Sequence, residues 1–137
     1  MEFTHKLVAV VNKDLDPGVA LNAVAHMCIG LGSHIGVEQL RLDTYVDANG
    51  NSYHHISQMP FIILRGKSQE IRKLVVLARE QKVIHNVFLH TMTGGTYQEQ
   101  LANTRNTQEE QLIYYGAVLC GPWDTVSQMT KKFSLWR

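Results

Sequence analysis

Asn22 and His26 are the first residues of the chain whose types and spacing could support chemistry. They lie four positions apart in a segment that predicts a helix, so their side chains share one face. Histidine can act as an acid, a base or a metal ligand near neutral pH, and asparagine can orient a substrate or a water molecule. A hydrogen-bonded polar pair inside an interface or under a loop would need the same residues. Both interpretations stay open from the sequence.

Lys13 and Asp14 precede this helix, in the loop that follows a predicted strand. Loops between strands and helices are common ligand sites in open α/β sheets, and the amides at a helix N-terminus favour anions. The chain contains neither G-x-G-x-x-G nor G-x-x-x-x-G-K-[ST], the glycine-rich motifs of dinucleotide and nucleoside triphosphate sites. We therefore expect a small ligand near Lys13, Asp14 and Asn22, and no cofactor.

Thr91 and Thr93 lie in His90–Thr96, a segment rich in hydroxyl groups and glycine. Such a segment can bind an oxyanion through its backbone N–H groups, or it can be a surface turn before the next helix. A serine hydrolase of the G-x-S-x-G type is not expected, because that motif is missing.

The seven histidines do not predict a metal site. His54 and His55 are adjacent on a predicted strand and point to opposite faces, and the chain has no H-x-x-x-H or C-x-x-C motif. Basic residues concentrate between positions 65 and 82, which favours a solvated surface or a phosphate-bearing partner such as RNA. A net charge of only +1 argues against a constitutive nucleic-acid binder.

The length of 137 residues predicts a single domain over residues 1–137, with 45% apolar and 18% charged residues. Cys28 and Cys120 lie in apolar stretches and are expected to be free, buried thiols in a reducing compartment. We find neither a signal peptide nor an apolar run of about 20 residues, so we expect a cytoplasmic protein without a membrane segment.

Short apolar runs predict strands, and periodic patterns predict helices between them. The expected strands are 6–11, 61–65, 83–90, 116–120 and 132–136. The expected helices are 17–31, 69–81, 97–104, 107–114 and 123–129, and Gly30 and Gly32 are expected to end the first of them. A β-hairpin with a type I′ turn at Asn49-Gly50 is expected at about 41–57.

The first helix has an unusual composition. Between Val19 and Leu31 its only strongly polar side chains are Asn22 and His26. A helix on the surface of a globular protein normally carries lysines and glutamates on its outer face. We therefore expect the sheet to cover one side of this helix and a second subunit to cover the other, which predicts a homodimer.

Four stretches resemble the uncharacterised bacterial family known as domain of unknown function two-thousand: K-L-V-A-V-V-N-K-D-L-D-P-G from Lys6, the hairpin Y-V-D-A-N-G-N, the loop T-M-T-G-G-T and the ending T-K-K-F-S-L-W-R. The resemblance covers essentially the whole chain. It implies membership of the family, and the family's name carries no function.

More distantly, the chain resembles the archaeal and eukaryotic type of peptidyl-tRNA hydrolase. Residues in corresponding places are Asp14-Leu15, Gly18, His26, Gly121-Pro122 and Thr130-Lys131. This resemblance implies a three-layer α/β/α fold with a four-stranded mixed sheet, in a protein that is often dimeric. Val19 and Ala23 replace that family's lysine and glutamine, so peptidyl-tRNA hydrolysis by its machinery is not expected.

Three functions follow as hypotheses. The first is a dimeric small-ligand-binding protein whose cleft lies near Lys13, Asp14, Asn22 and His26. The second is a hydrolase of an ester or amide bond with His26 as the base, assisted by Thr91 or Thr93. The third is an RNA-associated protein that uses the basic region 65–82.

Overall fold

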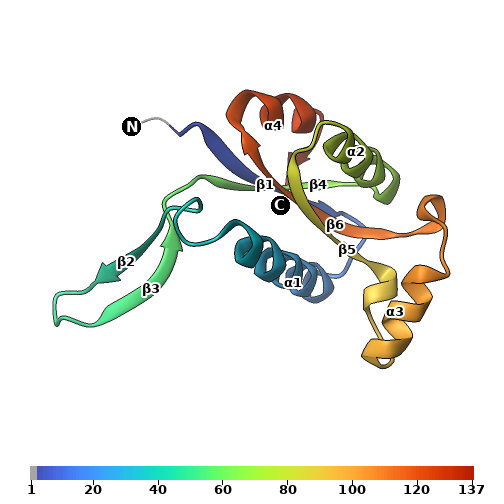
Figure 1. Cartoon of the computed structure of the whole chain (residues 1–137), viewed down its shortest axis with the longest axis horizontal. Coiled ribbons are helices and arrows are strands. Elements are labelled where there is room, and N and C mark those ends of the chain that lie inside the picture. Colours follow the sequence, from blue (N-terminus) through green and yellow to red (C-terminus); the bar gives the residue numbers. More distant parts are fainter. Residues whose placement is uncertain (1–2) are drawn as a thin grey trace.

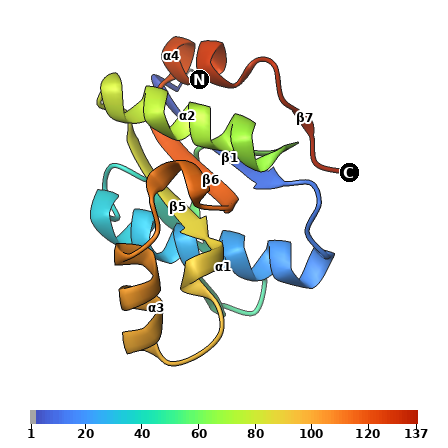
Figure 2. The same ribbon diagram turned by 90° about the vertical axis from the view of Figure 1, so that its right-hand side faces the viewer.

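The computed structural model describes residues 3–137, and its main sheet there has five strands in the order β5-β6-β1-β4-β7. Figure 1 labels the first four of these strands, and Figure 2 labels β7. β1 and β4 are parallel, and the other neighbours are antiparallel. The strands are β1 (His5–Asn12), β4 (Phe61–Gly66), β5 (Ile84–Leu89), β6 (Tyr114–Pro122) and β7 (Ser134–Leu135). The expected mixed sheet is confirmed. The number of four strands that the hydrolase resemblance implied is wrong, because β7 adds a fifth strand beside β4. The sequence pattern predicted this strand at 132–136, and the structure limits it to Ser134–Leu135.

Helices cover both faces of the sheet. α1 (Pro17–Ile35) packs on one face, and α2 (Ser68–Glu80) and α4 (Trp123–Thr130) pack on the other (Figures 1 and 2). α3 (Tyr97–Arg105) lies beyond the end of β5, next to the short 3-10 helix His90–Met92. The domain therefore has three layers, with one hydrophobic cluster on each side of the sheet.

β1 lies in the middle of the sheet and is buried on both faces, as its valine-rich sequence predicts. Val8 and Val10 point into the cluster beneath α2, whereas Leu7 and Ala9 point into the cluster beneath α1. None of these four side chains is more than 4% exposed. β1 therefore joins the two halves of the core.

α1 does not end at Gly30 or Gly32, and this expectation was wrong. The helix continues to Ile35 and ends at Gly36, whose φ of 93° lies in the left-handed region that favours glycine. Gly30 lies inside the helix, where its lack of a side chain allows Asn86 of β5 to approach closely. A Cβ at Gly30 would lie 2.9 Å from Nδ2 of Asn86 on β5, and this nitrogen donates a 3.0 Å hydrogen bond to the Met27 carbonyl.

Gly30→Ala is expected to leave the domain about 1–2 kcal/mol less stable than Gly32→Ala. Both variants gain the helix propensity of alanine, but only the methyl group at position 30 would displace the Asn86 amide from the Met27 carbonyl. Gly32→Ala is the matched control. Its Cβ would meet only Leu40 Cδ1 at 3.8 Å, so the higher helix propensity of alanine should make it neutral or stabilising by up to about 1 kcal/mol. Urea unfolding of the two variants measures the difference, and equal stabilities would contradict this role of Gly30.

The expected hairpin is confirmed as β2 (Leu42–Val46) and β3 (Ser52–Ser57), which we call the arm. The expected type I′ turn is wrong, because only Gly50 of the pair Asn49-Gly50 has a positive φ. The Asp47 carboxylate accepts hydrogen bonds from the backbone N–H groups of Asn49 and Asn51 and from the Tyr53 hydroxyl. The Asn51 side-chain amide also donates to this carboxylate, at 3.0 Å. The bond from Tyr53 and then those from Asn51 contribute most to lowering the pKa of Asp47 to about 2.

Two other helix boundaries differ from those expected from the sequence. The expected helix 107–114 is only a 3-10 turn at Glu109–Gln111, after which the chain enters β6. Ser68 does not cap α2 but begins it, and its Oγ accepts a 2.8 Å hydrogen bond from the backbone N–H of Tyr114. Thr96 caps α3 through a 3.2 Å bond from the Glu99 N–H.

α1 is long and apolar enough, by length and composition alone, to cross a membrane, and it is the one such helix within residues 3–137. The core helix of a globular domain can meet the same description. One side of α1 packs on the sheet through Ala20, Ala23, Met27 and Leu31, each at most 4% exposed. In this structure the helix is thus a layer of the domain.

Candidate functional site

Asn22 and His26 lie on an exposed side of α1 rather than in a closed pocket. The His26 ring stacks on Phe88 of β5, with 5.4 Å between the ring centroids and an interplanar angle of 18°. Phe88 in turn contacts the Tyr115 ring, at a centroid distance of 6.2 Å. His26 is therefore accessible to water, but neither of the two cavities described below includes it or Asn22.

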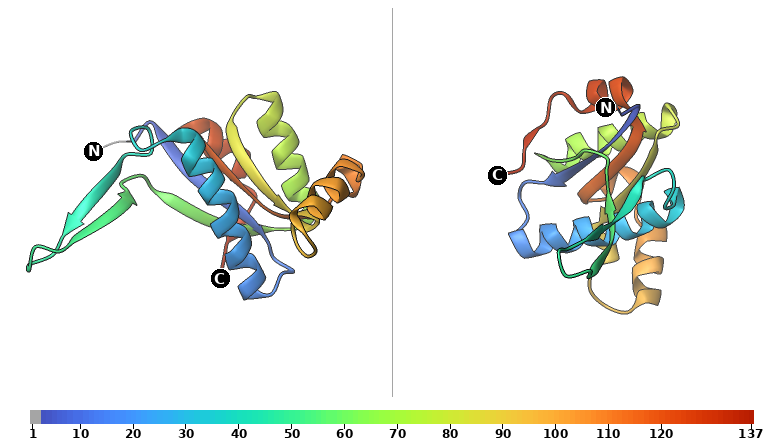
Figure 3. Two further views of the ribbon diagram at one scale, coloured as in Figure 1. Left: turned by 60° about the horizontal axis from the view of Figure 1, so that its bottom comes forward. Right: turned by 90° about the vertical axis from the view of Figure 1, so that its left-hand side faces the viewer.

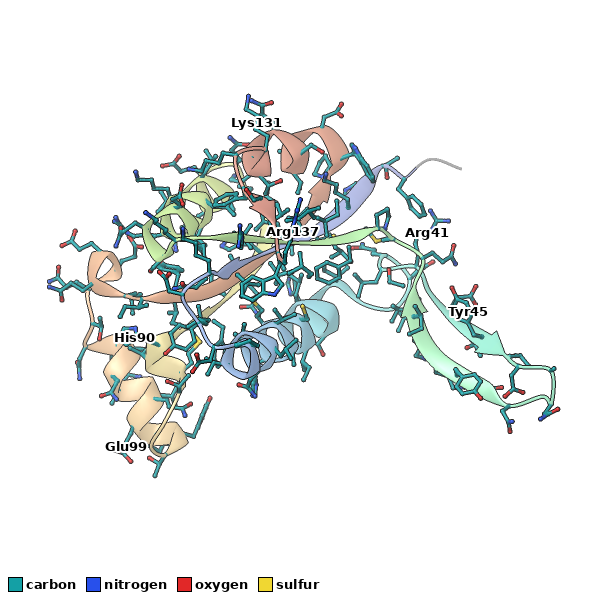
Figure 4. All side chains as sticks on the ribbon, turned by 180° about the vertical axis from the view of Figure 1, so that it is seen from behind. Arg41, Tyr45, His90, Glu99, Lys131 and Arg137 are labelled. Carbon is teal, nitrogen blue, oxygen red and sulfur yellow. The ribbon has the colours of Figure 1, made fainter. Side chains whose placement is uncertain are left out.

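Thr91 and Thr93 follow β5, and their hydroxyl groups serve the local structure. Thr91 is 5% exposed, and its Oγ1 lies 2.7 Å from Oγ1 of Thr104 on α3. The Thr93 hydroxyl donates a 2.6 Å bond to the His90 carbonyl, and Figure 4 shows His90 where β5 gives way to α3. Within residues 3–137, no hydrogen bond links His26 to either threonine. The arrangement of base and hydroxyl that a hydrolase would need is not assembled here.

Lys13 and Asp14 lie in a loop that a buried asparagine holds in place. Asn12 ends β1 at 5% exposure, and its Nδ2 donates a 3.0 Å bond to the Tyr114 carbonyl on β6. Its Oδ1 accepts a 2.9 Å bond from the Asp14 N–H, and the Lys13 N–H donates to the Gly66 carbonyl of β4 at 3.0 Å. The loop is thus tied to strands on both sides of β1.

A crevice of about 220 Å³ opens beside this loop, and three cationic side chains line it. Lys13 comes from the end of β1, Arg65 from the end of β4, and Lys132 from the segment before β7. The remaining lining residues are Gly66, Glu70, Phe133 and Ser134. Three cations against the single carboxylate of Glu70 leave a net charge of +2, so the crevice attracts anions.

None of these three cations forms an ion pair within the part of the chain that the structure describes, where Arg72–Glu109 is the one salt bridge. The Glu70 carboxylate accepts a 3.3 Å bond from the Lys67 N–H at the start of α2. The Lys132 ammonium lies 5.3 Å from the centroid of the Phe133 ring. The positive charge of the crevice is therefore left largely uncompensated.

The topology places this crevice where open α/β sheets commonly bind ligands. β1 and β4 are parallel neighbours, and the loops after them lead to helices on opposite faces of the sheet. Because the connection after β1 and the connection after β4 turn to opposite faces, an opening is left between them at the carboxyl ends of the two strands. The sequence pointed to Lys13 and Asp14 for this reason. It missed Arg65 and Lys132, which come from distant segments and meet the loop only in the folded domain.

A larger cavity of about 640 Å³ lies at the other end of β1, among Phe3, His5, Met59 and Cys120. Arg41 and Lys82 also line this cavity, and within residues 3–137 no carboxylate does. Arg41 donates a 3.3 Å bond to Gln58 and lies 4.9 Å from the centroid of the Phe3 ring. None of the candidate residues from the sequence lines this cavity, and it lies at the amino ends of the parallel strands. We therefore regard the crevice as the better candidate site.

One cation of the basic region 65–82 is neutralised within the domain. Arg72 donates bonds of 2.8 to 3.0 Å to both carboxylate oxygens of Glu109, which lower the Glu109 pKa. The Tyr114 hydroxyl also donates to Glu109, at 2.8 Å. Burial, together with this bond, raises the Tyr114 pKa to about 12. Arg72 is therefore engaged within the domain, whereas Arg65 belongs to the crevice.

Both cysteines are free, as expected, and burial raises the pKa of each thiol. Such thiols are poor nucleophiles near neutral pH. Within residues 3–137, the structure contains no group of three or more histidine, cysteine, aspartate or glutamate side chains that could hold a metal ion.

Comparisons with known proteins agree with the fold and add no activity. A solved structure of a protein of unknown function, Atu0240 from Agrobacterium tumefaciens, is similar with a TM-score of 0.87 and 20% sequence identity. The similarity covers 99% of this chain and 100% of that one, and at this identity it shows the fold alone. No functionally curated protein matches. The family model for proteins of unknown function DUF2000 matches residues 5–137, and the chain therefore belongs to that family.

Proposed function

We propose that this protein binds a small oxyanion, a phosphate or a carboxylate, in the crevice lined by Lys13, Arg65 and Lys132. The observation that carries the proposal is the convergence of three cations from separate segments, with no carboxylate paired to any of them in the described chain. Cationic side chains that line one opening attract an anion, and a bound anion would compensate their charge. Lysine and arginine both suit such a ligand.

The size of the crevice limits the ligand. Sites for drug-sized molecules commonly enclose about 300–1,000 Å³, and the crevice holds about 220 Å³. It therefore suits inorganic phosphate, a short carboxylic acid, or the anionic end of a longer molecule. Its three cationic side chains are exposed, so binding should weaken as ionic strength rises.

A thermal-shift titration with inorganic phosphate tests this function. At 100 times the dissociation constant, a ligand that binds only the native state adds about 2.7 kcal/mol, which raises the melting temperature by several degrees. Arg65→Gln and Lys132→Gln should each lose most of this shift. Arg105→Gln and Lys131→Gln, which remove equivalent charges from exposed positions outside the crevice, should keep it.

Sodium chloride at the same ionic strength controls for general salt effects. A phosphate shift that survives Arg65→Gln and Lys132→Gln, or no shift with phosphate or with a carboxylate such as citrate, would refute the proposed site.

The fold supports a relationship to the archaeal and eukaryotic type of peptidyl-tRNA hydrolase only as a proposal. In that comparison, Asp14 and Leu15 of the β1–α1 loop lie in places that correspond to the D-L of the hydrolases. Val19 and Ala23 stand where the hydrolases have lysine and glutamine, and Ala23 is fully buried against the sheet. Binding without peptidyl-tRNA cleavage is the function that we infer, in a cytoplasmic protein.

A further inference from the structure

α1 presents an uncharged face to the outside of the domain. Leu21 and Ile29 are 71% and 72% exposed, and Val19 is 41% exposed. No aspartate, glutamate, lysine or arginine occurs between Pro17 and Val37. A helix face that meets water normally carries charged residues. The outer face of α1 therefore has the composition of an interface rather than that of a solvated surface.

The arm is a second unpartnered apolar surface of the same chain. It projects away from the three-layer body, starting near the end of α1 (Figures 1 and 3). Four large side chains on it are 53% to 63% exposed: Tyr45, Val46, Tyr53 and Ile56. Figure 4 shows Tyr45 out on the arm, away from the body.

Within residues 3–137, the hydrogen bonds between the arm and the body lie at the base of the arm. The Ser57 hydroxyl donates to the Leu40 carbonyl there, and the Gln58 N–H donates to the Arg41 carbonyl. A two-stranded hairpin without a packing surface is marginal in water. The arm thus needs a second surface to bury its tyrosines and aliphatic side chains.

We propose that two copies of this chain form a two-fold symmetric dimer in which the arm of each copy lies on the outer face of α1 of the other. Under two-fold symmetry, the helix of the first copy contacts the arm of the second, and the arm of the first contacts the helix of the second. A single two-fold rotation therefore covers both unpartnered surfaces. Neighbouring side chains of a strand point to opposite faces, so the cross-strand pair Tyr45 and Tyr53 is the part of the arm that can lie on Leu21 and Ile29 of the other copy. These four side chains present on the order of 500 Å² per copy, more than half of the about 800 Å² that each partner contributes to a standard interface.

A second copy fits these surfaces better than a lipid bilayer does. Helices that lie in a membrane interface combine an apolar face with lysines and arginines on the polar one. α1 has neither of these residues, and its other side is already packed on the sheet. A membrane would also leave the arm without an assigned role. The dimer accounts for the helix and the arm together, and it is independent of the anion crevice.

Light scattering of gel-filtered protein at micromolar concentration tests this interface. The unmodified chain should be a dimer. Ile29→Lys on α1 and Tyr45→Glu on the arm should each weaken the dimer at least tenfold, because each places a charge in an apolar contact. Both side chains are exposed in the single chain, so circular dichroism should show unchanged folding. Leu135→Lys on β7, also exposed at 53%, is the control and should stay dimeric.

Mixing the two variants distinguishes arm-on-helix contact from helix-on-helix contact. In the mixed pair, the introduced ammonium of one copy meets the introduced carboxylate of the other, and the second arm–helix contact is native. The mixture should therefore recover the dimer that neither variant forms alone. The proposal would be overturned if the unmodified chain were monomeric in solution. It would also be overturned if a monomeric chain bound anionic vesicles in a flotation assay, because a membrane would then be the partner of α1. A dimer that withstands Tyr45→Glu, or a mixture that stays monomeric, would overturn it too.

Discussion

Met27→Ala is expected to lower the free energy of unfolding by about 2–5 kcal/mol, the range for truncating a long apolar side chain in a core. Met27 is 1% exposed and lies between α1 and the sheet. A Cβ at Gly116 of β6 would lie only 3.0 Å from Met27 Cε, which shows how closely this side chain approaches the strand. The truncated residue would leave a cavity that the rigid sheet cannot close.

Urea unfolding measures this loss, and Leu135→Ala is the matched control because its side chain is 53% exposed. The control should stay within about 0.5 kcal/mol of the unmodified chain. Both substitutions are best compared in the Ile29→Lys background, so that subunit association does not contribute to the measured stability. A loss of less than 1 kcal/mol for Met27→Ala would mean that α1 is not packed on the sheet as described.

Asn12→Ala is expected to cost about 1–3 kcal/mol and to abolish the phosphate-dependent thermal shift. The substitution leaves the Tyr114 carbonyl and the Asp14 N–H without their side-chain partner, and an unsatisfied buried polar group carries a penalty of this size. It also releases the loop that presents Lys13 to the crevice. Stability and binding should therefore fall together, although Asn12 does not line the crevice.

Asn103→Ala controls for the loss of an asparagine side chain, since Asn103 is exposed on α3. Its stability and its phosphate shift should match those of the unmodified chain. If Asn12→Ala unfolds at the same urea concentration as the control and still binds phosphate, the loop does not depend on Asn12.

Much of the core could be predicted from local patterns. The apolar positions Ile71, Leu74, Val75 and Ala78 recur at helical spacing, and all four are buried in α2 against the sheet. The valine-rich β1 likewise lies in the centre of the sheet, because a run without polar residues can only be buried on both faces. The covering of one side of α1 by the sheet is confirmed, and its covering by a second subunit stays a proposal.

Two of the predictions that proved wrong concern a helix end and the strands of the sheet, both of which depend on contacts between segments distant in the sequence. Gly30 and Gly32 looked like a helix end, but the close approach of Asn86 requires the first of them inside the helix. The short β7 pairs through Leu135 and Ser134 with β4, which lies some seventy positions earlier, so its place could not be read locally.

The candidate site was predicted only in part. Lys13 and Asp14 were candidates by the general rule for strand ends, and of the two only Lys13 lines the crevice. Arg65 looked like one member of a basic region, because its approach to Lys13 depends on the parallel pairing of β1 with β4. Thr91 and Thr93 were candidates by composition, and their hydrogen bonds to Thr104 and the His90 carbonyl exist only in the fold.

Nuclear magnetic resonance of the ¹⁵N-labelled chain during titration with inorganic phosphate is the most direct test of the anion crevice. We expect saturable shifts at the backbone amides of Lys13, Gly66 and Ser134, which adjoin the three cations. The amides of Thr4 and Gly121, in the larger cavity, should not move. Shifts confined to that cavity, or none at millimolar phosphate, would contradict our account of where this protein binds its ligand.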